Sequence, residues 1–241
     1  MKLRKYLSRA NAAKKALFSS SQRKHCLRLW RSFSLGSNVD AAIPWIPFDA
    51  SDFLDRCLKS DSKVFEYGSG GSTLFWLKRG MTCVSIEHDP EWYLRMKELV
   101  HGQSSADLRL VRPEQGTIGA GDPSEPNDYA SSDAIGIGNN FRNYASQIDQ
   151  FPDEWFDLVV VDGRARPSCV MHSIKKVRMG GMLLLDNSDR EYYLQKTSTM
   201  LKGFEARKFS GVTPGLVRWS ESTAFVKHST DRVFRGRPRA I

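Results

Sequence analysis

One stretch, residues 63–89 with the sequence KVFEYGSGGSTLFWLKRGMTCVSIEHD, constrains the fold of this chain more than any other. Its first apolar residues predict a strand, which a glycine-rich loop interrupts at 68–71. Residues 72–79 are enough for two helical turns, and Gly80 follows as a helix stop. Residues 82–86 alternate in polarity and are partly β-branched, which predicts a second strand. Two strands joined by a helix form the βαβ unit of a doubly wound sheet.

Two acidic residues indicate which ligand such a unit would hold. Glu87 ends the second strand 19 residues after Gly68, a spacing at which an acid can accept hydrogen bonds from both ribose hydroxyls. Glu66 precedes the glycines, where a carboxylate is expected to repel a dinucleotide pyrophosphate and to attract the cationic S-adenosylmethionine. Thr73 also replaces the third glycine of the G-x-G-x-x-G pattern. The stretch favours S-adenosylmethionine over NAD; the alternative is an α/β domain whose glycines serve only tight turns.

The stretch resembles the Rossmann-like (class I) S-adenosylmethionine-dependent methyltransferases. EYGSGGST is similar to their first motif and SIEHD to their second, and the resemblance continues through FDLVVVDG and GGMLLLDN, roughly over residues 48–227. It implies a mostly parallel, seven-stranded α/β sheet with helices on both faces. We expect His88 to pack on the adenine. The positions that the resemblance assigns to the cofactor are Glu66, Gly68, Ser69, Gly70, Ser72, Thr73, Glu87, His88 and Asp162.

The rest of the chain continues this alternation of strands and helices. Further helices are predicted at residues 49–58, 90–100, 140–150, 167–179 and 188–201. Further strands are predicted at 108–111, 156–161, 182–185, 204–209 and 223–226, the last two as a hairpin-like pair. With the two strands of the opening motif, this makes seven strands.

Three local features refine these elements. Asp49 or Ser51 can cap the helix before the first strand, and Cys57 is expected to face the core from that helix. Pro167 is expected to begin a helix that the glycine pair at 180–181 ends.

Residues 113–140 interrupt the alternation with a segment rich in Gly, Ser, Asp and Asn. A loop of this length in a compact domain is usually a functional lid or a disordered segment. It follows the third strand at the carboxyl edge of the sheet, where ligands bind. The segment is therefore either a mobile cover over the cofactor or an inert insertion.

Polar residues at the strand ends indicate where chemistry takes place. Asp162 and the pair Asp186-Asn187 are similar to the metal ligands of the catechol-type O-methyltransferases, which implies a Mg²⁺ ion held by oxygen atoms. Such an ion would lower the pKa of an acceptor hydroxyl. The lysine expected after the first aspartate is absent, because GRAR stands at 163–166. Without a metal, Asp162 is the candidate base or orienting group, and both aspartates can instead cap the helices that follow.

Arg164 and Arg166 lie just beyond Asp162, at the mouth of the predicted crevice. Guanidinium groups bind carboxylates and phosphates through two parallel hydrogen bonds. The two arginines therefore predict an anionic acceptor, such as an acid or a sugar phosphate, and we count them with Asp162 among the catalytic candidates. The alternative is that they pair with the acids between residues 186 and 191.

The net charge of +9 belongs to one end of the chain. Residues 1–39 hold ten of the 36 Lys and Arg residues and no acid. The rest of the chain therefore holds 26 Lys and Arg residues and 27 Asp and Glu residues, so it is nearly neutral. We therefore expect a basic N-terminal extension at 1–40, a methyltransferase domain at 41–228 and a basic tail at 229–241. The extension fits an amphipathic helix on an anionic membrane surface, an organelle-targeting peptide, or helices packed on the domain.

The composition narrows the function. No apolar run approaches the roughly 18 residues that span a bilayer, and four cysteines without C-x-x-C spacing are expected to be reduced in the cytoplasm. The near-neutral body lacks the broad basic face of a nucleic-acid binder. The sequence predicts an O-methyltransferase acting on a small-molecule or glycan hydroxyl. The alternatives are a nicotinamide-dependent oxidoreductase, a nucleic-acid-modifying methyltransferase that uses the basic arm, and a noncatalytic cofactor-binding module.

Overall fold

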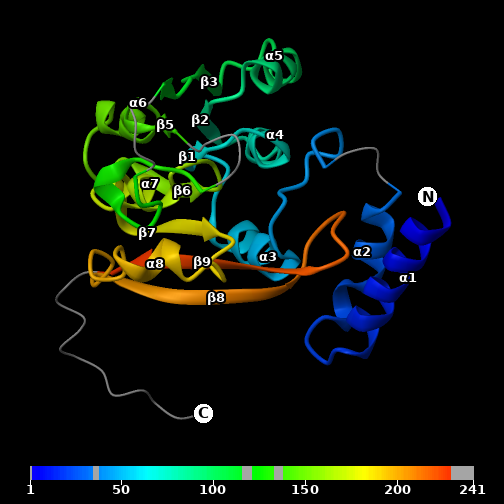
Figure 1. Ribbon diagram of the computed structural model, residues 1–241. Helices are drawn as coiled ribbons and strands as arrows, with labels where there is room; N and C mark the ends of the chain where they lie inside the picture. The colour runs from blue at the N-terminus through cyan, green and yellow to red at the C-terminus, as the bar shows by residue number, and fades with distance from the viewer. Residues whose placement is uncertain (1, 35–37, 116–120, 133–137, 229–241) are drawn as a thin grey trace.

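A single seven-stranded sheet organises the structure, a computed structural model that describes residues 2–34, 38–115, 121–132 and 138–228. Its strands are β1 (Lys63–Tyr67), β2 (Thr82–Glu87), β3 (Ala106–Leu110), β6 (Phe156–Val161), β7 (Val177–Asp186), β8 (Phe204–Val212) and β9 (Trp219–Lys227). They lie in the order β3-β2-β1-β6-β7-β9-β8. β9 runs antiparallel to both of its neighbours, β7 and β8, and every other neighbouring pair is parallel. The predicted mostly parallel sheet is confirmed (Figure 1).

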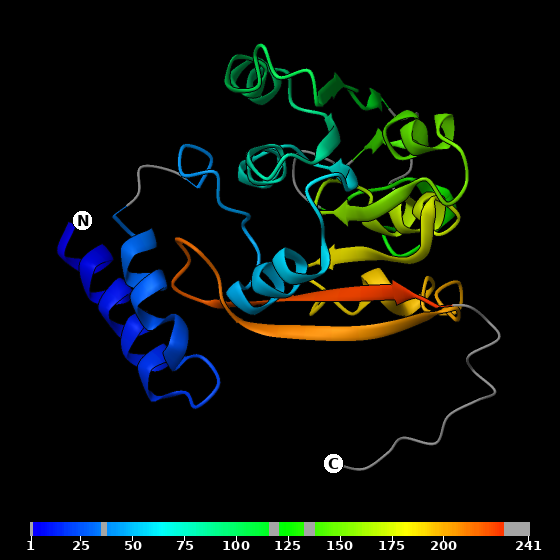
Figure 2. The same cartoon turned by 180° about the vertical axis from the view of Figure 1, so that it is seen from behind.

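Helices cover both faces of this sheet (Figures 1 and 2). One face carries α3 (Phe48–Cys57), α4 (Gly71–Lys78) and α5 (Pro90–Leu99). The other carries α6 (Arg142–Ala145), η3 (Ser146–Gln150), α7 (Arg166–Ser173) and α8 (Tyr192–Gln195). Successive side chains of a strand alternate between faces, so Val64 belongs to the first apolar cluster and Phe65 to the second. Both faces of the central strands are therefore buried.

The helix before β1 begins earlier than predicted. Pro47 is the N-cap of α3, and neither Asp49 nor Ser51 caps it, because both lie inside the helix. Asp49 instead accepts a hydrogen bond from Gln22. Cys57, expected in the core, is exposed at the end of α3.

Two predictions after β6 are wrong. The glycine pair at 180–181 does not end a helix: α7 ends at Ser173, and the pair lies inside β7. Gly180 has φ +75, and the β6–β7 register shifts beside it, so the glycines serve an irregularity of the strand. The helix predicted at 188–201 is shorter in the structure and covers only α8. After it, the Thr197 hydroxyl donates a hydrogen bond of 2.8 Å to the Tyr193 carbonyl, and the chain continues in turns.

The insertion at 113–140 is partly structured. It begins with β4 (Glu114–Gln115), contains η2 (Pro126–Asp128), and ends with β5 (Asn139–Asn140), which pairs antiparallel with β4. Lys196 forms ion pairs with Asp122 and Glu125, which holds the middle of the insertion near α8. Residues 116–120 and 133–137 lie outside the described part, so the mobile-cover interpretation remains a prediction for them.

The N-terminal extension folds into α1 (Lys2–Phe18), η1 (Arg23–His25) and α2 (Cys26–Ser32). α1 and α2 lie side by side, next to the turn that joins β8 to β9 (Figures 1 and 2). They share an apolar cluster with the domain, formed by Ala12, Ala16, Leu29, Phe33, Phe48 and Val212. The extension thus takes the third predicted arrangement, helices packed on the domain.

Polar contacts reinforce this packing. The Gln22 amide donates to Asp49 at 2.9 Å, and its oxygen accepts from the Val212 N–H at 3.1 Å. Although burial opposes ionisation, hydrogen bonds from Lys24, His25 and Gln22 lower the pKa of Asp49 to about 2. No helix within the described ranges has the length and apolar character needed to cross a membrane. The tail at 229–241 lies outside those ranges.

Candidate active site

A cleft of about 740 Å³ lies at the carboxyl ends of β1, β2, β6 and β7. The strand ends and the loops that follow them form one side, at 68–72, 87–89, 162–164 and 186–187. The other side comes from the extension and the β8–β9 turn, and includes Arg9, Phe33, Asn38, Trp45, Leu216 and Arg218. The predicted crevice is therefore present, with a second wall that the sequence did not indicate.

The glycine loop is packed between the residues that follow β6 and the segment that precedes α3. Gly68 has φ +92, which favours glycine, and an added Cβ would lie 3.2 Å from the Gly163 Cα. Gly71 leaves no room for a side chain, because its Cβ would lie 2.3 Å from the Ile43 carbonyl oxygen. Gly70 is different: a Cβ there meets nothing within 4 Å and would enter the cleft. The Trp92 indole N–H donates 2.8 Å to the Ser69 carbonyl and fixes the loop further.

Glu87 is buried, and its carboxylate lines the cleft. One oxygen accepts from the Ser69 N–H at 3.1 Å and from its hydroxyl at 2.8 Å. The other oxygen accepts from the N–H groups of His88 at 2.7 Å and Asp89 at 2.9 Å. Burial opposes ionisation, but the His88 side chain, the Asp89 N–H and the Ser69 hydroxyl lower the pKa of Glu87. The group is a carboxylate at neutral pH, as ribose binding requires.

Glu66 does not lie where the sequence placed it. Its carboxyl group is fully buried and does not line the cleft. It accepts hydrogen bonds from the hydroxyls of Ser72, Thr73 at 2.6 Å and Ser85 at 3.0 Å. Burial raises its pKa, although these hydroxyls oppose the shift. Glu66 therefore supports the loop from behind, and the argument that its charge would repel a pyrophosphate no longer holds.

Thr73 and Ser72 act on the same loop. The Thr73 hydroxyl donates to Glu66 and accepts 2.9 Å from the Gly70 N–H, so it couples the buried acid to the turn. Ser72 lines the cleft as well as contacting Glu66. Of the cofactor positions predicted in the first motif, Gly68, Ser69, Gly70 and Ser72 line the cleft.

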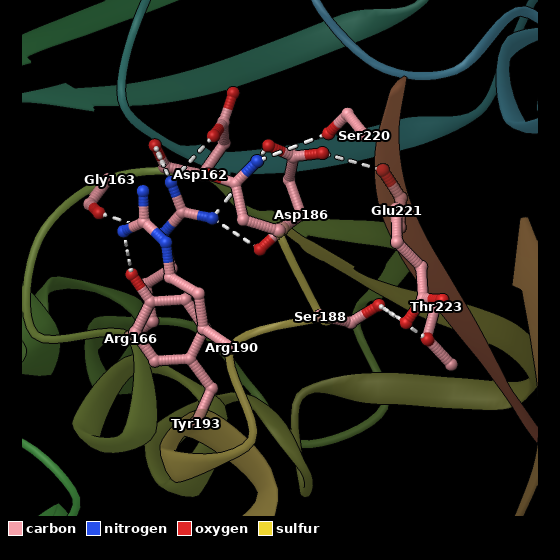
Figure 3. Close-up of polar contacts among 12 residues, drawn as sticks. Asp162, Gly163, Arg166, Asp186, Ser188, Arg190, Tyr193, Ser220, Glu221 and Thr223 are labelled. Carbon is pink, nitrogen blue, oxygen red and sulfur yellow. Dashed lines mark hydrogen bonds and ion pairs between the residues drawn. The ribbon is translucent and has the colours of Figure 1, made fainter. Parts of the chain in front are cut away.

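Arg166 lies between the two strand-end aspartates (Figure 3). Its guanidinium donates one hydrogen bond of 2.9 Å to the Asp162 carboxylate and another of 3.2 Å to the Asp162 carbonyl. It also donates to the Asp186 carbonyl and lies 3.8 Å from the Asp186 carboxylate. Burial and the neighbouring Asp186 raise the pKa of Asp162, while Arg166 opposes that shift. The arginine predicted to face an acceptor is thus bound to the protein's own acids.

A divalent cation does not fit these residues as they are arranged. The Arg166 guanidinium already bridges Asp162 and Asp186, where two of the three predicted ligands would have to converge on a metal ion. Asn187, the third, has φ +50, and its amide donates 3.3 Å to the Ser220 hydroxyl. Across the described ranges, no group of three or more His, Cys, Asp or Glu side chains is placed to hold a metal.

Arg164 and His88 continue the polar chain that begins at Glu87. His88 Nδ1 lies 2.8 Å from the Glu87 carboxylate, and Arg164 Nε donates 3.0 Å to His88 Nε2. The His88 ring also lies edge-on to Phe141, with centroids 6.1 Å apart. Glu87, His88 and Arg164 all line the cleft. Packing of His88 on the adenine stays a prediction.

Sequence reasoning missed the second wall of the cleft. Arg9 lies on α1 and Phe33 directly follows α2, and the only signal for these helices was a run of basic residues with intervening leucines. Arg218 comes from the β8–β9 turn, which carried no signal. Tyr144 was placed on a helix, but its role was not seen: a Cβ on Gly163 would lie 2.0 Å from the Tyr144 hydroxyl, so this glycine makes room for the tyrosine.

Comparison with known proteins identifies the fold. No protein-family model and no curated protein matches the sequence. An O-methyltransferase from Bacillus cereus in complex with S-adenosylhomocysteine matches with a TM-score of 0.53 and 15% identity, over 79% of this chain and 86% of that one. A putative O-methyltransferase from Klebsiella pneumoniae matches with a TM-score of 0.52 and 14% identity, over 83% of this chain and 90% of that one. The chain therefore has the Rossmann-like fold of the S-adenosylmethionine-dependent methyltransferases.

Proposed function

We propose that the protein is an S-adenosylmethionine-dependent methyltransferase that acts on a hydroxyl of a small-molecule or glycan acceptor. The observation that supports this most directly is the cleft, which joins the glycine loop at 68–71, the ionised Glu87 and Asp162 in one space. Among the solved structures that share the fold, the one from Bacillus cereus is an O-methyltransferase in complex with S-adenosylhomocysteine. The four cysteines are free, which agrees with a reducing compartment such as the cytoplasm.

The cofactor would lie along the glycine loop and supply the methyl group. Gly70 leaves the loop open towards the cleft. Glu87 would accept a hydrogen bond from a ribose hydroxyl, because rotation of the Ser69 hydroxyl would free one acceptor position on its carboxylate. His88, beside Glu87 in the same wall, would contact the adenine.

Asp162 is the group best placed to receive the acceptor's proton. Its side chain is 31% exposed and lines the cleft, while Arg166 fixes one carboxylate oxygen. A raised pKa brings this carboxylate closer to the pH at which a general base works best. The acceptor oxygen would bond to the methyl carbon as the carbon–sulfur bond breaks, and the hydroxyl proton would pass to Asp162. Arg166 then acts as a positioning residue and keeps the carboxylate aimed into the cleft.

The second wall would bind the acceptor and select an anionic one. Arg9 and Arg218 both line the cleft, and within the described ranges neither forms an ion pair with an acid. The Arg9 guanidinium lies 5.2 Å from the centre of the Phe33 ring, which combines positive charge with an apolar surface. An acceptor with a carboxylate or phosphate beside an apolar group matches this wall. Arg9 and Arg218 thus take the anchoring role that the sequence suggested for Arg164 and Arg166.

Cofactor binding tests the proposal through Gly70. Calorimetry is expected to show binding of S-adenosylhomocysteine by the wild-type protein, and loss of it in Gly70→Val, whose side chain would fill the cofactor's space. Gly203→Val is the matched control, since a Cβ there also meets nothing within 4 Å but lies far from the cleft residues. NAD and NADP are titrated in parallel. Tight binding of either nucleotide without binding of S-adenosylhomocysteine overturns the proposal.

The acceptor class is tested with matched phenols that carry either a carboxylate or the corresponding carboxamide. Methyl transfer is expected only to the carboxylate member, and Arg218→Gln or Arg9→Gln is expected to raise KM more than it lowers kcat. Lys14→Gln, on α1 but not in the cleft wall, is the control. Equal transfer to both members of each pair would contradict an anionic acceptor while leaving the cofactor assignment intact.

A further inference from the structure

We propose that Arg166 is a built-in substitute for a divalent cation, and that its removal leaves a cation site formed by Asp162, Asp186 and Asn187. This inference concerns cation binding and goes beyond the proposed methyl transfer, on which it does not depend. It follows from the mismatch between the oxygen ligands that Asp162, Asp186 and Asn187 would offer and the guanidinium that lies between the two aspartates (Figure 3).

The hydrogen-bond partners of Arg166 are all oxygen atoms, and its guanidinium also lies 5.2 Å from the centre of the Tyr193 ring. Its Nε donates 3.1 Å to the Gly163 carbonyl, one terminal nitrogen contacts both oxygen types of Asp162, and the other contacts the Asp186 carbonyl. Carboxylate and carbonyl oxygens are the ligands that Mg²⁺, Ca²⁺ and Mn²⁺ prefer. The position is therefore chemically suited to a hard cation. In this protein the Arg166 guanidinium provides the positive charge there.

The backbone directs Arg166 into this position. Ala165, which precedes it, has φ +44 and ψ +47, a left-handed conformation that is unfavourable for a residue with a Cβ. This turn makes Arg166 the first residue of α7. Its side chain points back towards Asp162 and Asp186, at the carboxyl ends of β6 and β7. Only 8% of Arg166 is exposed, so the charge is buried together with its partners. A strained turn before a buried cation indicates that the contact is maintained by the rest of the fold.

The charge balance explains what removal of Arg166 would do. Asp186 is buried, and its carboxylate accepts 2.5 Å from the Ser222 hydroxyl. The Arg166 guanidinium donates 2.9 Å to the Asp162 carboxylate and lies 3.8 Å from the Asp186 carboxylate, so one cation serves both acids. Without the guanidinium, two neighbouring carboxylates would share a partly buried space, and either a proton or a cation would have to compensate them. Within the described ranges, no donor bonds the Asn187 amide oxygen, which leaves it as a third ligand.

The test measures binding of Mn²⁺ alone by calorimetry and electron paramagnetic resonance on the full chain. The wild-type protein is expected to show no site at these acids, whereas Arg166→Ala is expected to gain one that binds about tenfold or more tightly than any wild-type site. Adding Asp186→Asn to Arg166→Ala should abolish it. Arg190→Ala is the matched control, because Arg190 lies 5.7 Å from the Tyr193 ring, beside Arg166, without contacting the aspartates.

Two outcomes would overturn the proposal. One is a wild-type Mn²⁺ site that Asp186→Asn removes, because a cation would then bind with Arg166 in place. The other is a folded Arg166→Ala variant that gains no site. If Arg166→Ala is unfolded without metal, Mn²⁺ is expected to restore its native circular dichroism, since a ligand that binds only the folded state stabilises it. Failure to restore folding also contradicts the proposal.

Discussion

Gly71 and Ile43 meet across the front of the glycine loop, where a Cβ on Gly71 would lie 2.3 Å from the Ile43 carbonyl oxygen. The Asn38 carbonyl oxygen lies on the same side, 2.7 Å from that Cβ. The segment after α2 is therefore pressed against the start of α4, and the N-terminal extension is joined to the loop that is proposed to hold the cofactor.

The close approach at Gly71 predicts that adding a single methyl group there destabilises the protein. Gly71→Ala should lower the free energy of unfolding by about 1–3 kcal/mol, because the backbone atoms that it meets cannot move aside as a flexible side chain would. Urea denaturation measures the change. Gly203→Ala is the control, since its Cβ meets nothing within 4 Å, and an equal effect of both substitutions would show that the close approach is not responsible.

Gln22 predicts how strongly the extension is attached. Gln22→Ala should cost about 1–3 kcal/mol of stability, because it leaves the buried Val212 N–H without its acceptor. Gln195→Ala, at an exposed position of α8, should change stability by less than about 0.5 kcal/mol. Equal stabilities in urea for Gln22→Ala and the wild type would mean that the extension contributes little.

Glu66 predicts a pH dependence with a definite sign. Burial raises its pKa above the ordinary value of 4.5, so the folded state favours the protonated acid. Its contribution to stability is then complete below the unfolded pKa and is lost as the pH rises through the folded pKa. The stability of the wild type relative to Glu66→Gln should therefore fall as the pH rises above about 4.5. Unfolding measured at several pH values checks this, and a difference that grows with pH contradicts it.

Glu87 predicts the cost of losing the ribose contact. Glu87→Gln should weaken binding of S-adenosylhomocysteine by about 1.5–3 kcal/mol, because hydrogen bonds to a charged acceptor are replaced by bonds to a neutral one. Calorimetry on the folded variant measures this, with Glu91→Gln on the exposed side of α5 as the control. An unchanged affinity would assign the ribose to another group.

Much of the fold was predictable from local patterns. Asp89 accepts from the N–H groups of Glu91 and Trp92 and begins α5, with Pro90 in the first turn, because these residues suit a helix start wherever the helix packs. The apolar run at 156–161 became a central strand because an uninterrupted apolar segment must be buried on both faces. Such rules act over a few residues, so the sequence contains them in full.

What the sequence by itself determined is the seven-stranded sheet, the glycine loop and the place where the acids gather. The tertiary structure alone decided what those acids contact: Glu66 turned behind the loop, and Arg166 took the space between Asp162 and Asp186. It also decided that Gln22 would bind Val212, a residue 190 positions away. The physical reason is that strand and helix formation depend on neighbouring residues. The partner of a buried charge or amide depends on which distant groups the completed fold brings within hydrogen-bonding distance.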